Sequence, residues 1–192
     1  MRELIALAFT MIFVNNVLLS QFLGICSFIG VSKKRSSAVG MGLSVILVTF
    51  LAGTISWMLY NWVLIPLEVP YLYLLVFILV IASIVQLLEM VLKKYVPSLY
   101  KALGIYLPLI TTNCAILGVA VTGNIKASYD LLTMVVYSLA IGAGYLIVMF
   151  IFSGIREKIE NLPVPAPFKG APIALIIAGF MALAFSGLLG VL

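Results

Sequence analysis

The residues of this chain best able to do chemistry are its two cysteines, Cys26 and Cys114. Each opens the same short pattern, C-x-x-x-G-V, which reads CSFIGV in the first case and CAILGV in the second. Thiolates bind iron–sulfur clusters, and two thiols can also form a disulfide. A free cysteine can equally be a small apolar filler. Because the whole pattern recurs, the two thiols occupy equivalent positions, and all three interpretations stay open at this stage.

A cluster at these thiols would need help from another chain. A [2Fe–2S] cluster takes four thiolates, and this chain has two cysteines. A partner must then supply the other pair, most simply a homologous subunit in the opposite orientation. The chain has no histidine, which excludes histidine-ligated haem, histidine-containing zinc sites and histidine proton relays. The spacing also fits neither a zinc knuckle nor a C-x-x-C motif.

The composition places the thiols in a membrane protein. Of the 192 residues, 65% are hydrophobic and 9% are charged, whereas a soluble domain carries about 25% charged residues. Several apolar runs reach the roughly 20 residues that a membrane span needs. The first run starts at Leu4 without a basic leader, which predicts a retained span. The lysines and arginines lie in short loops without stacking aromatics, so we predict the lipid bilayer, and not nucleic acid, as a partner.

Six spans are predicted, in an all-α polytopic fold. Their ranges are near 4–30, 38–62, 70–92, 102–121, 131–153 and 171–192. Each cysteine motif lies in the first span of a three-span half, which divides the chain into residues 1–97 and 98–192. Because three is odd, the second half enters the membrane from the opposite side. This is an inverted-topology repeat, whose functional site is expected near the midplane.

The distribution of positive charge predicts the orientation. Most lysines and arginines follow the first, third and fifth spans, and only Arg2 and Lys126 lie on the other side. We therefore expect both termini outside and the basic loops in the cytoplasm. The residues of these loops are Lys33, Lys34, Arg35, Lys93, Lys94, Lys101, Arg156, Lys158 and Lys169.

Residues that interrupt helices cluster beside both cysteines. They are Asn15, Asn16, Gly24 and Gly30 in the first span, and Pro108, Thr111, Thr112, Asn113 and Gly118 in the fourth. Continuous helices would hold the sulfurs about 17 Å apart along the membrane normal, whereas broken helices let a pseudo-twofold axis bring them together. The polar side chains could hydrogen-bond to a cluster, line an ion route or satisfy backbone groups at the breaks.

Three stretches of the sequence resemble a known family. They are VNNVLLSQFLGICSFIGVSKK at 14–34, GIYLPLITTNCAILGVA at 104–120 and VPAPFKG at 164–170. These stretches closely resemble the RnfA/NqrE family of membrane subunits, and the similarity covers essentially the whole chain. The two cysteine motifs are highly specific to this family. The VNN and TTNC segments favour its Rnf branch over its Nqr branch.

The resemblance implies a membrane subunit of an ion-motive ferredoxin:NAD oxidoreductase in a bacterial or archaeal plasma membrane. It implies that Cys26 and Cys114 ligate a [2Fe–2S] cluster with two cysteines of the homologous subunit RnfE, and that RnfB, RnfC, RnfD and RnfG complete the complex. Electrons would pass between carriers on the two membrane faces, coupled to Na⁺ or H⁺. The family's covalent flavin motif, Ser-Gly-Ala-Thr, is absent from this sequence, so neither flavin nor haem is expected on this chain.

Two other functions compete with the electron carrier. Inverted repeats with broken helices are typical of secondary transporters, although this chain offers almost no charged groups for a midplane substrate site. A structural scaffold with inert thiols is the third possibility. Substitution of either cysteine by serine separates them, since a scaffold tolerates the change and a cluster site loses iron.

Overall fold

The computed structural model describes residues 2–68, 70–95, 107–126, 129–160, 162–163 and 165–187. Within this part of the chain every regular element is a helix, which confirms the predicted all-α class. The α-helices are α1 (Arg2–Phe9), α2 (Ile25–Val31), α3 (Arg35–Leu59), α4 (Tyr73–Tyr95), α6 (Leu107–Thr111), α7 (Cys114–Val121), α8 (Leu131–Glu160) and α9 (Ala171–Ser186). Short π-helical turns follow α1, α3 and α7, at Thr10–Val14, Tyr60–Leu64 and Thr122–Lys126. Single 3₁₀ turns occupy Pro70–Leu72 and Ala166–Phe168.

Three of the described helices are long and apolar enough to cross a membrane. They are Arg35–Leu64, Tyr73–Tyr95 and Leu131–Ile159, and the shorter α9 is also apolar. Large apolar side chains are exposed along them, including Leu79, Leu132 and Leu183, each more than 60% exposed. A surface of this kind is suited to lipid, so the chain is a membrane protein.

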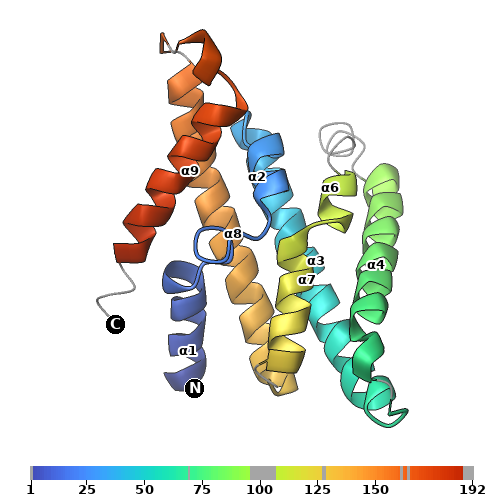
Figure 1. The fold of residues 1–192 in the computed structure, drawn as a ribbon. Coiled ribbons are helices and arrows are strands. Elements are labelled where there is room, and N and C mark those ends of the chain that lie inside the picture. Colours follow the sequence, from blue (N-terminus) through green and yellow to red (C-terminus); the bar gives the residue numbers. More distant parts are fainter. Residues whose placement is uncertain are drawn as a thin grey trace.

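The long helices α3 and α8 form the centre of the bundle (Figure 1). Glycines let their backbones approach closely. A Cβ atom at Gly142 would lie 2.9 Å from Cα of Ile46, and one at Gly42 would lie 3.0 Å from Cγ of Leu146. Buried residues of both helices, among them Met41 and Met149, complete this core. The pair is the rigid support against which the shorter helices pack.

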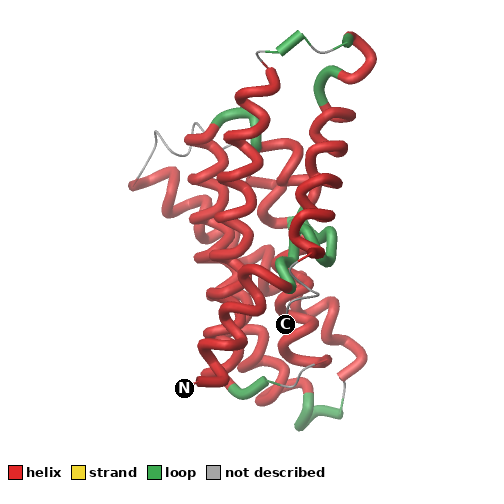
Figure 2. Tube along the Cα trace, turned by 90° about the vertical axis from the view of Figure 1, so that its left-hand side faces the viewer, coloured by secondary structure: helices red, strands yellow, loops and turns green. Residues whose placement is uncertain are grey.

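The first predicted span is split into two helices. The helical path of α1 and its π turn stops after Val14, and α2 begins only at Ile25. The intervening chain curls at mid-height of the molecule, and α2 then continues in the general direction of α1 (Figure 1). Turned by 90°, the molecule shows its non-helical segments at the two ends and at this middle level (Figure 2).

The fourth predicted span is also broken, though not at the proline. Thr112 and Asn113 separate α6 from α7. Pro108 instead lies in the first turn of α6 as the structure describes it, where a missing amide hydrogen costs little. The expected role of Pro108 at the break is therefore wrong. Residues 102–106 of this predicted span lie outside the described residues.

The helix α8 is about two turns longer than predicted, because the charged residues after Ser153 are helical and not part of a loop. Two interactions hold this extension. Arg35 Nε, at the start of α3, lies 2.6 Å from Glu157 Oε2. Arg156 is 4% exposed and donates from Nη1 to the Ile29 carbonyl at 2.6 Å and to Ser32 Oγ at 2.7 Å. The end of α8 thus fixes the end of α2.

Candidate functional site

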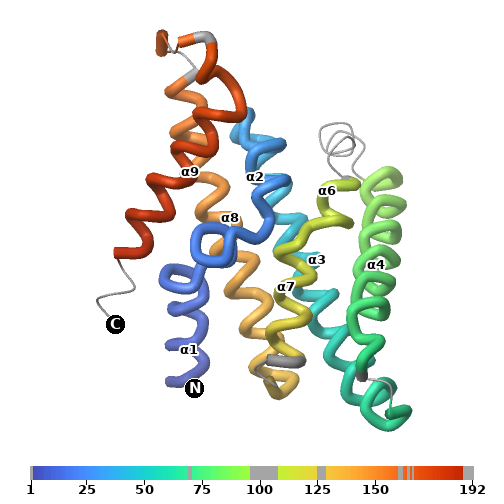
Figure 3. The backbone as a smooth tube through the Cα atoms, viewed as in Figure 1, coloured from blue at the N-terminus to red at the C-terminus, as the bar shows by residue number. Residues whose placement is uncertain are grey.

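The two cysteine motifs meet in the middle of the bundle. Helix α2 begins one residue before Cys26 and α7 begins at Cys114, and the two helices run in opposite directions from this level (Figure 3). The backbone amide of Gly24 donates a hydrogen bond to Cys114 Sγ at 2.9 Å. The broken helices therefore bring the two motifs together, as the choice between continuous and broken helices requires.

Both cysteines are free thiols, and both are exposed on the surface of this chain. A disulfide between them is therefore not present in this structure. Exposure also separates them from buried cysteines that fill gaps in an apolar core. The two thiols face outwards, where a second chain could reach them.

The start of α7 follows from local sequence. Asn113 has extended backbone angles (φ −71°, ψ 111°), and its side-chain oxygen accepts from the Ala115 amide at 3.1 Å. Asparagine is among the preferred residues at this position, because its oxygen satisfies an amide that has no partner within the helix. The cap sets Cys114 as the first residue of the helix.

The start of α2 depends on a glycine. Gly24 has φ +89°, in the left-handed region that favours residues without a Cβ atom. A Cβ atom there would lie 3.1 Å from Asn113 Oδ1 and 3.3 Å from Tyr145 Cε2. Gly24 thus combines a special backbone angle with a close approach to the second motif.

A buried polar group joins the two motifs to α8. Ser27 Oγ lies 2.7 Å from Tyr145 Oη and accepts from Asn113 Nδ2 at 3.4 Å. Roles for Ser27 and Tyr145 were not predicted from the sequence. The signal that could have found them was Tyr145 itself, since a tyrosine near the middle of an apolar span is away from the interfaces where tyrosine is usually enriched.

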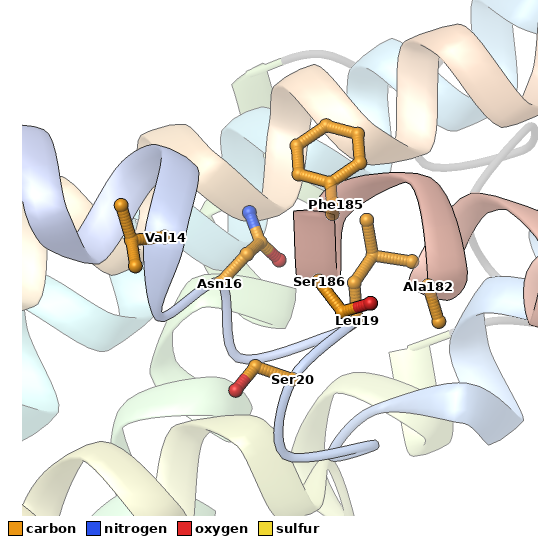
Figure 4. Close-up of a pocket in the computed structure, with 7 residues that line it drawn as sticks. All are labelled: Val14, Asn16, Leu19, Ser20, Ala182, Phe185 and Ser186. Carbon is orange, nitrogen blue, oxygen red and sulfur yellow. The ribbon is translucent and has the colours of Figure 1, made fainter. Parts of the chain in front are cut away.

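The asparagines of the first break satisfy backbone groups. Asn16 donates from Nδ2 to the Ile12 carbonyl at 2.9 Å and accepts from the Leu18 amide at 3.0 Å. Asn15 Oδ1 accepts a longer bond of 3.4 Å from Ser20. Figure 4 shows Asn16 facing the end of α9 across a small pocket, lined by Val14, Asn16, Leu19, Ser20, Ala182, Phe185 and Ser186. These bonds fit a role in holding the break.

The other predicted residues have packing or backbone roles. Thr112 donates from Oγ1 to the Pro108 carbonyl at 2.9 Å. Gly118 lies against Leu23, since a Cβ atom there would be 2.7 Å from its Cδ1, and Gly30 lies against Leu109 at 3.5 Å by the same measure. Thr111 is half-buried at the end of α6. The glycines at the fifth position of both motifs thus face a side chain of the opposite break.

The donor set matches part of a metal site. Among the described residues no group of three or more histidine, cysteine, aspartate or glutamate side chains could hold a metal ion. Two exposed thiols at the meeting point of two helices are instead half of the four thiolates that a [2Fe–2S] cluster takes. The residues present fit a cluster shared with another chain.

The fold and the site define a helical membrane protein with two free thiols where two broken helices meet. The family described as "Rnf-Nqr subunit, membrane protein" matches residues 4–192. The chain belongs to this family, and the resemblance in the two cysteine motifs is confirmed.

Relatives of this chain carry a more specific name. Proteins of Serratia proteamaculans (strain 568) and Yersinia enterocolitica (serotype O:8 / biotype 1B) are each 50% identical over 190 residues, which is 99% of this chain and 98% of theirs. A protein of Yersinia pseudotuberculosis (strain IP 31758) is 49% identical with the same coverage. All three are named as the same subunit of an ion-translocating oxidoreductase complex.

Proposed function

We propose that this chain is a membrane subunit of an ion-translocating oxidoreductase complex in which Cys26 and Cys114 hold one side of a [2Fe–2S] cluster. The observation that carries the proposal is the hydrogen bond of 2.9 Å from the Gly24 amide to Cys114 Sγ, which joins the two cysteine motifs. The family and the names of the relatives supply the redox context. A cluster bound by these thiols supplies one-electron transfer, here between ferredoxin or NAD on one face and carriers on the other.

The remaining two thiolates come from a homologous subunit in the opposite orientation, the counterpart of RnfE. Both thiols of this chain are exposed, which leaves them free to share a cluster with a second chain. The subunits RnfB, RnfC, RnfD and RnfG, and coupling to Na⁺ or H⁺, belong to the same proposal. The complex lies in the plasma membrane, with the basic loops of this chain in the cytoplasm and its termini outside.

The arrangement of the helices supports an inverted repeat of six spans. Helices α2, α3 and α4 run up, down and up in Figure 1, whereas α7, α8 and α9 run down, up and down. The first set follows Cys26 and the second follows Cys114. A pseudo-twofold axis in the membrane plane relates such halves, and it puts the thiols near the midplane.

The chain's own groups favour negative charge at the thiols. A thiolate–cluster assembly is anionic, and charge is costly within a bilayer. The Gly24 amide donates to Cys114 Sγ, and hydrogen bonds to charged groups are stronger than those between neutral groups. Cys114 also opens α7, an eight-residue helix whose first amides carry partial positive charge. These groups offset part of the cost of the anion.

Iron analysis tests the proposal directly. The sample is the purified complex of this chain with its membrane partner, prepared without oxygen, and the measurements are iron, acid-labile sulfide and the low-temperature EPR spectrum after reduction. We expect about two irons per heterodimer, lost in both Cys26→Ser and Cys114→Ser. Ser20→Ala, in the same break, is the control and retains the iron. A complex without iron, or serine variants with full iron content, would refute the proposal.

A further inference from the structure

Ser27, Asn113 and Tyr145 form a polar group inside an otherwise apolar interior. Ser27 lies on α2, Asn113 immediately precedes α7, and Tyr145 lies near the middle of α8. The three residues are 0%, 2% and 0% exposed, respectively. A buried polar group of this kind fixes a unique arrangement only when its members satisfy one another.

The direction of each hydrogen bond follows from the capacity of the serine hydroxyl, which has one hydrogen and two lone pairs. Ser27 donates to the Gly24 carbonyl at 2.8 Å. Only acceptor capacity then remains for Tyr145 Oη at 2.7 Å and Asn113 Nδ2 at 3.4 Å. Tyr145 is therefore a donor, and the Ser27 hydroxyl makes every hydrogen bond available to it.

This group holds Gly24 from several sides. The Gly24 carbonyl accepts from Ser27 and from the Phe28 amide, the latter at 3.1 Å. The space beside its Cα atom is closed by Asn113 Oδ1 and the ring of Tyr145. The one remaining backbone group of Gly24 is its amide, which points at Cys114 Sγ. The direction of that amide is thus set by the polar group.

We propose that Tyr145 and Ser27 are positioning residues for the sulfur of Cys114, and that by holding the Gly24 amide on this sulfur they raise the reduction potential of a cluster ligated there. The inference rests on the proposed function. Hydrogen bonds to cluster sulfurs are one of the means by which a protein sets the potential. They favour the reduced state, because that state carries one more negative charge. Tyr145 suits the role because α8 is part of the rigid central pair.

The test uses Tyr145→Phe and Ser27→Ala in the complex of this chain with its membrane partner. Tyr145→Phe removes one hydroxyl and keeps the buried ring. We expect retained iron, altered EPR g values and a more negative midpoint potential. The expected shift corresponds to about a three- to tenfold change in the ratio of oxidised to reduced cluster at fixed solution potential, and tenfold equals about 59 mV for one electron.

Each variant has a matched control on α8. Tyr137→Phe removes the hydroxyl of another buried tyrosine, whose side-chain partner is Thr122 and not a residue of the motifs. Ser153→Ala removes a buried hydroxyl that has no hydrogen-bond partner in the described part of the chain. Both controls should keep the potential and the g values of the unmodified complex. Shifts of equal size in the controls would overturn the proposal.

A second readout does not need iron. Hydrogen exchange by mass spectrometry should be faster in peptides covering 20–30 for Tyr145→Phe and Ser27→Ala, and unchanged for the controls. If the unmodified complex lacks iron, the proposed function fails, and exchange alone then decides whether Tyr145 and Ser27 position Gly24. Retained iron with unaltered potential, g values and exchange in both variants would overturn the positioning role while leaving the cluster in place.

Discussion

Cys26 and Cys114 follow breaks of very different lengths. In the first, the chain leaves the helical path from Asn15 to Gly24, whereas in the second only Thr112 and Asn113 do so. Asn113 caps its helix with its own side chain. Gly24 has no side chain, and its conformation is held by groups from other elements.

The difference shows that one motif can be placed by two kinds of chemistry. The second break is closed by residues adjacent in sequence. The first is closed by Tyr145 of α8 and by Cys114 itself, which lie far along the chain. Substitutions at the first break should therefore affect both motifs, and substitutions at the second should act more locally.

Gly24→Ala is expected to have the largest effect. An alanine at φ +89° costs about 1–2 kcal/mol, and its Cβ atom would press on Asn113 and Tyr145, which brings the loss to about 3 kcal/mol. The measurement is the free energy of unfolding in mixed micelles, from SDS titration followed by circular dichroism. Gly179→Ala, in open space on α9, is the control. Equal losses in the two variants would mean that Gly24 is not special.

Arg156→Gln ranks second, because it acts on the far end of α2. The substitution weakens charge-assisted hydrogen bonds to the Ile29 carbonyl and Ser32, at a cost of about 2 kcal/mol. Hydrogen exchange should quicken over 25–31 and stay constant over 114–121, since α7 continues into its own π turn. Arg35→Gln is the control, because its ion pair is about half exposed and contributes about 0.5 kcal/mol or less. Uniform acceleration in both segments would contradict this assignment.

Asn113→Ala tests the local cap and should cost about 1 kcal/mol. Asn113→Ser separates two roles of the side chain, because serine also caps helices but is too short to replace the amide that reaches Ser27. Exchange over 115–121 should be fast in the alanine variant and near normal in the serine variant. If both variants exchange equally fast, the bond to Ser27 and not the cap holds this break.

Ser20→Ala and Thr112→Val should have the smallest effects. Both residues are exposed, and each hydroxyl makes one bond within its own break. Exposed substitutions of this kind usually change stability by about 0.5 kcal/mol or less. The same micelle titration measures them. A loss above about 1 kcal/mol at one site only would identify the break that depends on its surface hydroxyl.

The sequence was informative about where the breaks lie. Asparagine, threonine and glycine inside apolar runs indicate backbone that leaves the helix, and both breaks contain residues of this kind. Pro108 was misleading, since a proline breaks a helix only in its interior and is tolerated in the first turn. The charged end of α8 was misread for a related reason. Charge predicts a loop until a partner is known, and the partners of Arg156 and Glu157 lie on distant segments.

The partners within the site could not be predicted. Ser27 has no counterpart in the second motif, where Ala115 stands in its place. Its function depends on Tyr145, which lies 118 positions later in the chain. Pattern analysis locates residues along a helix, but it does not identify contacts between segments so far apart.

The same separations have a consequence for biosynthesis. Gly24 and Ser27 are made before their partners Cys114 and Tyr145, which follow 90 and 118 positions later. At roughly 5–20 residues per second, the ribosome needs about 6–24 s to reach Tyr145. The first break therefore enters the translocon as a polar interruption without its final partners, and it becomes a stable part of the fold only when the second half arrives.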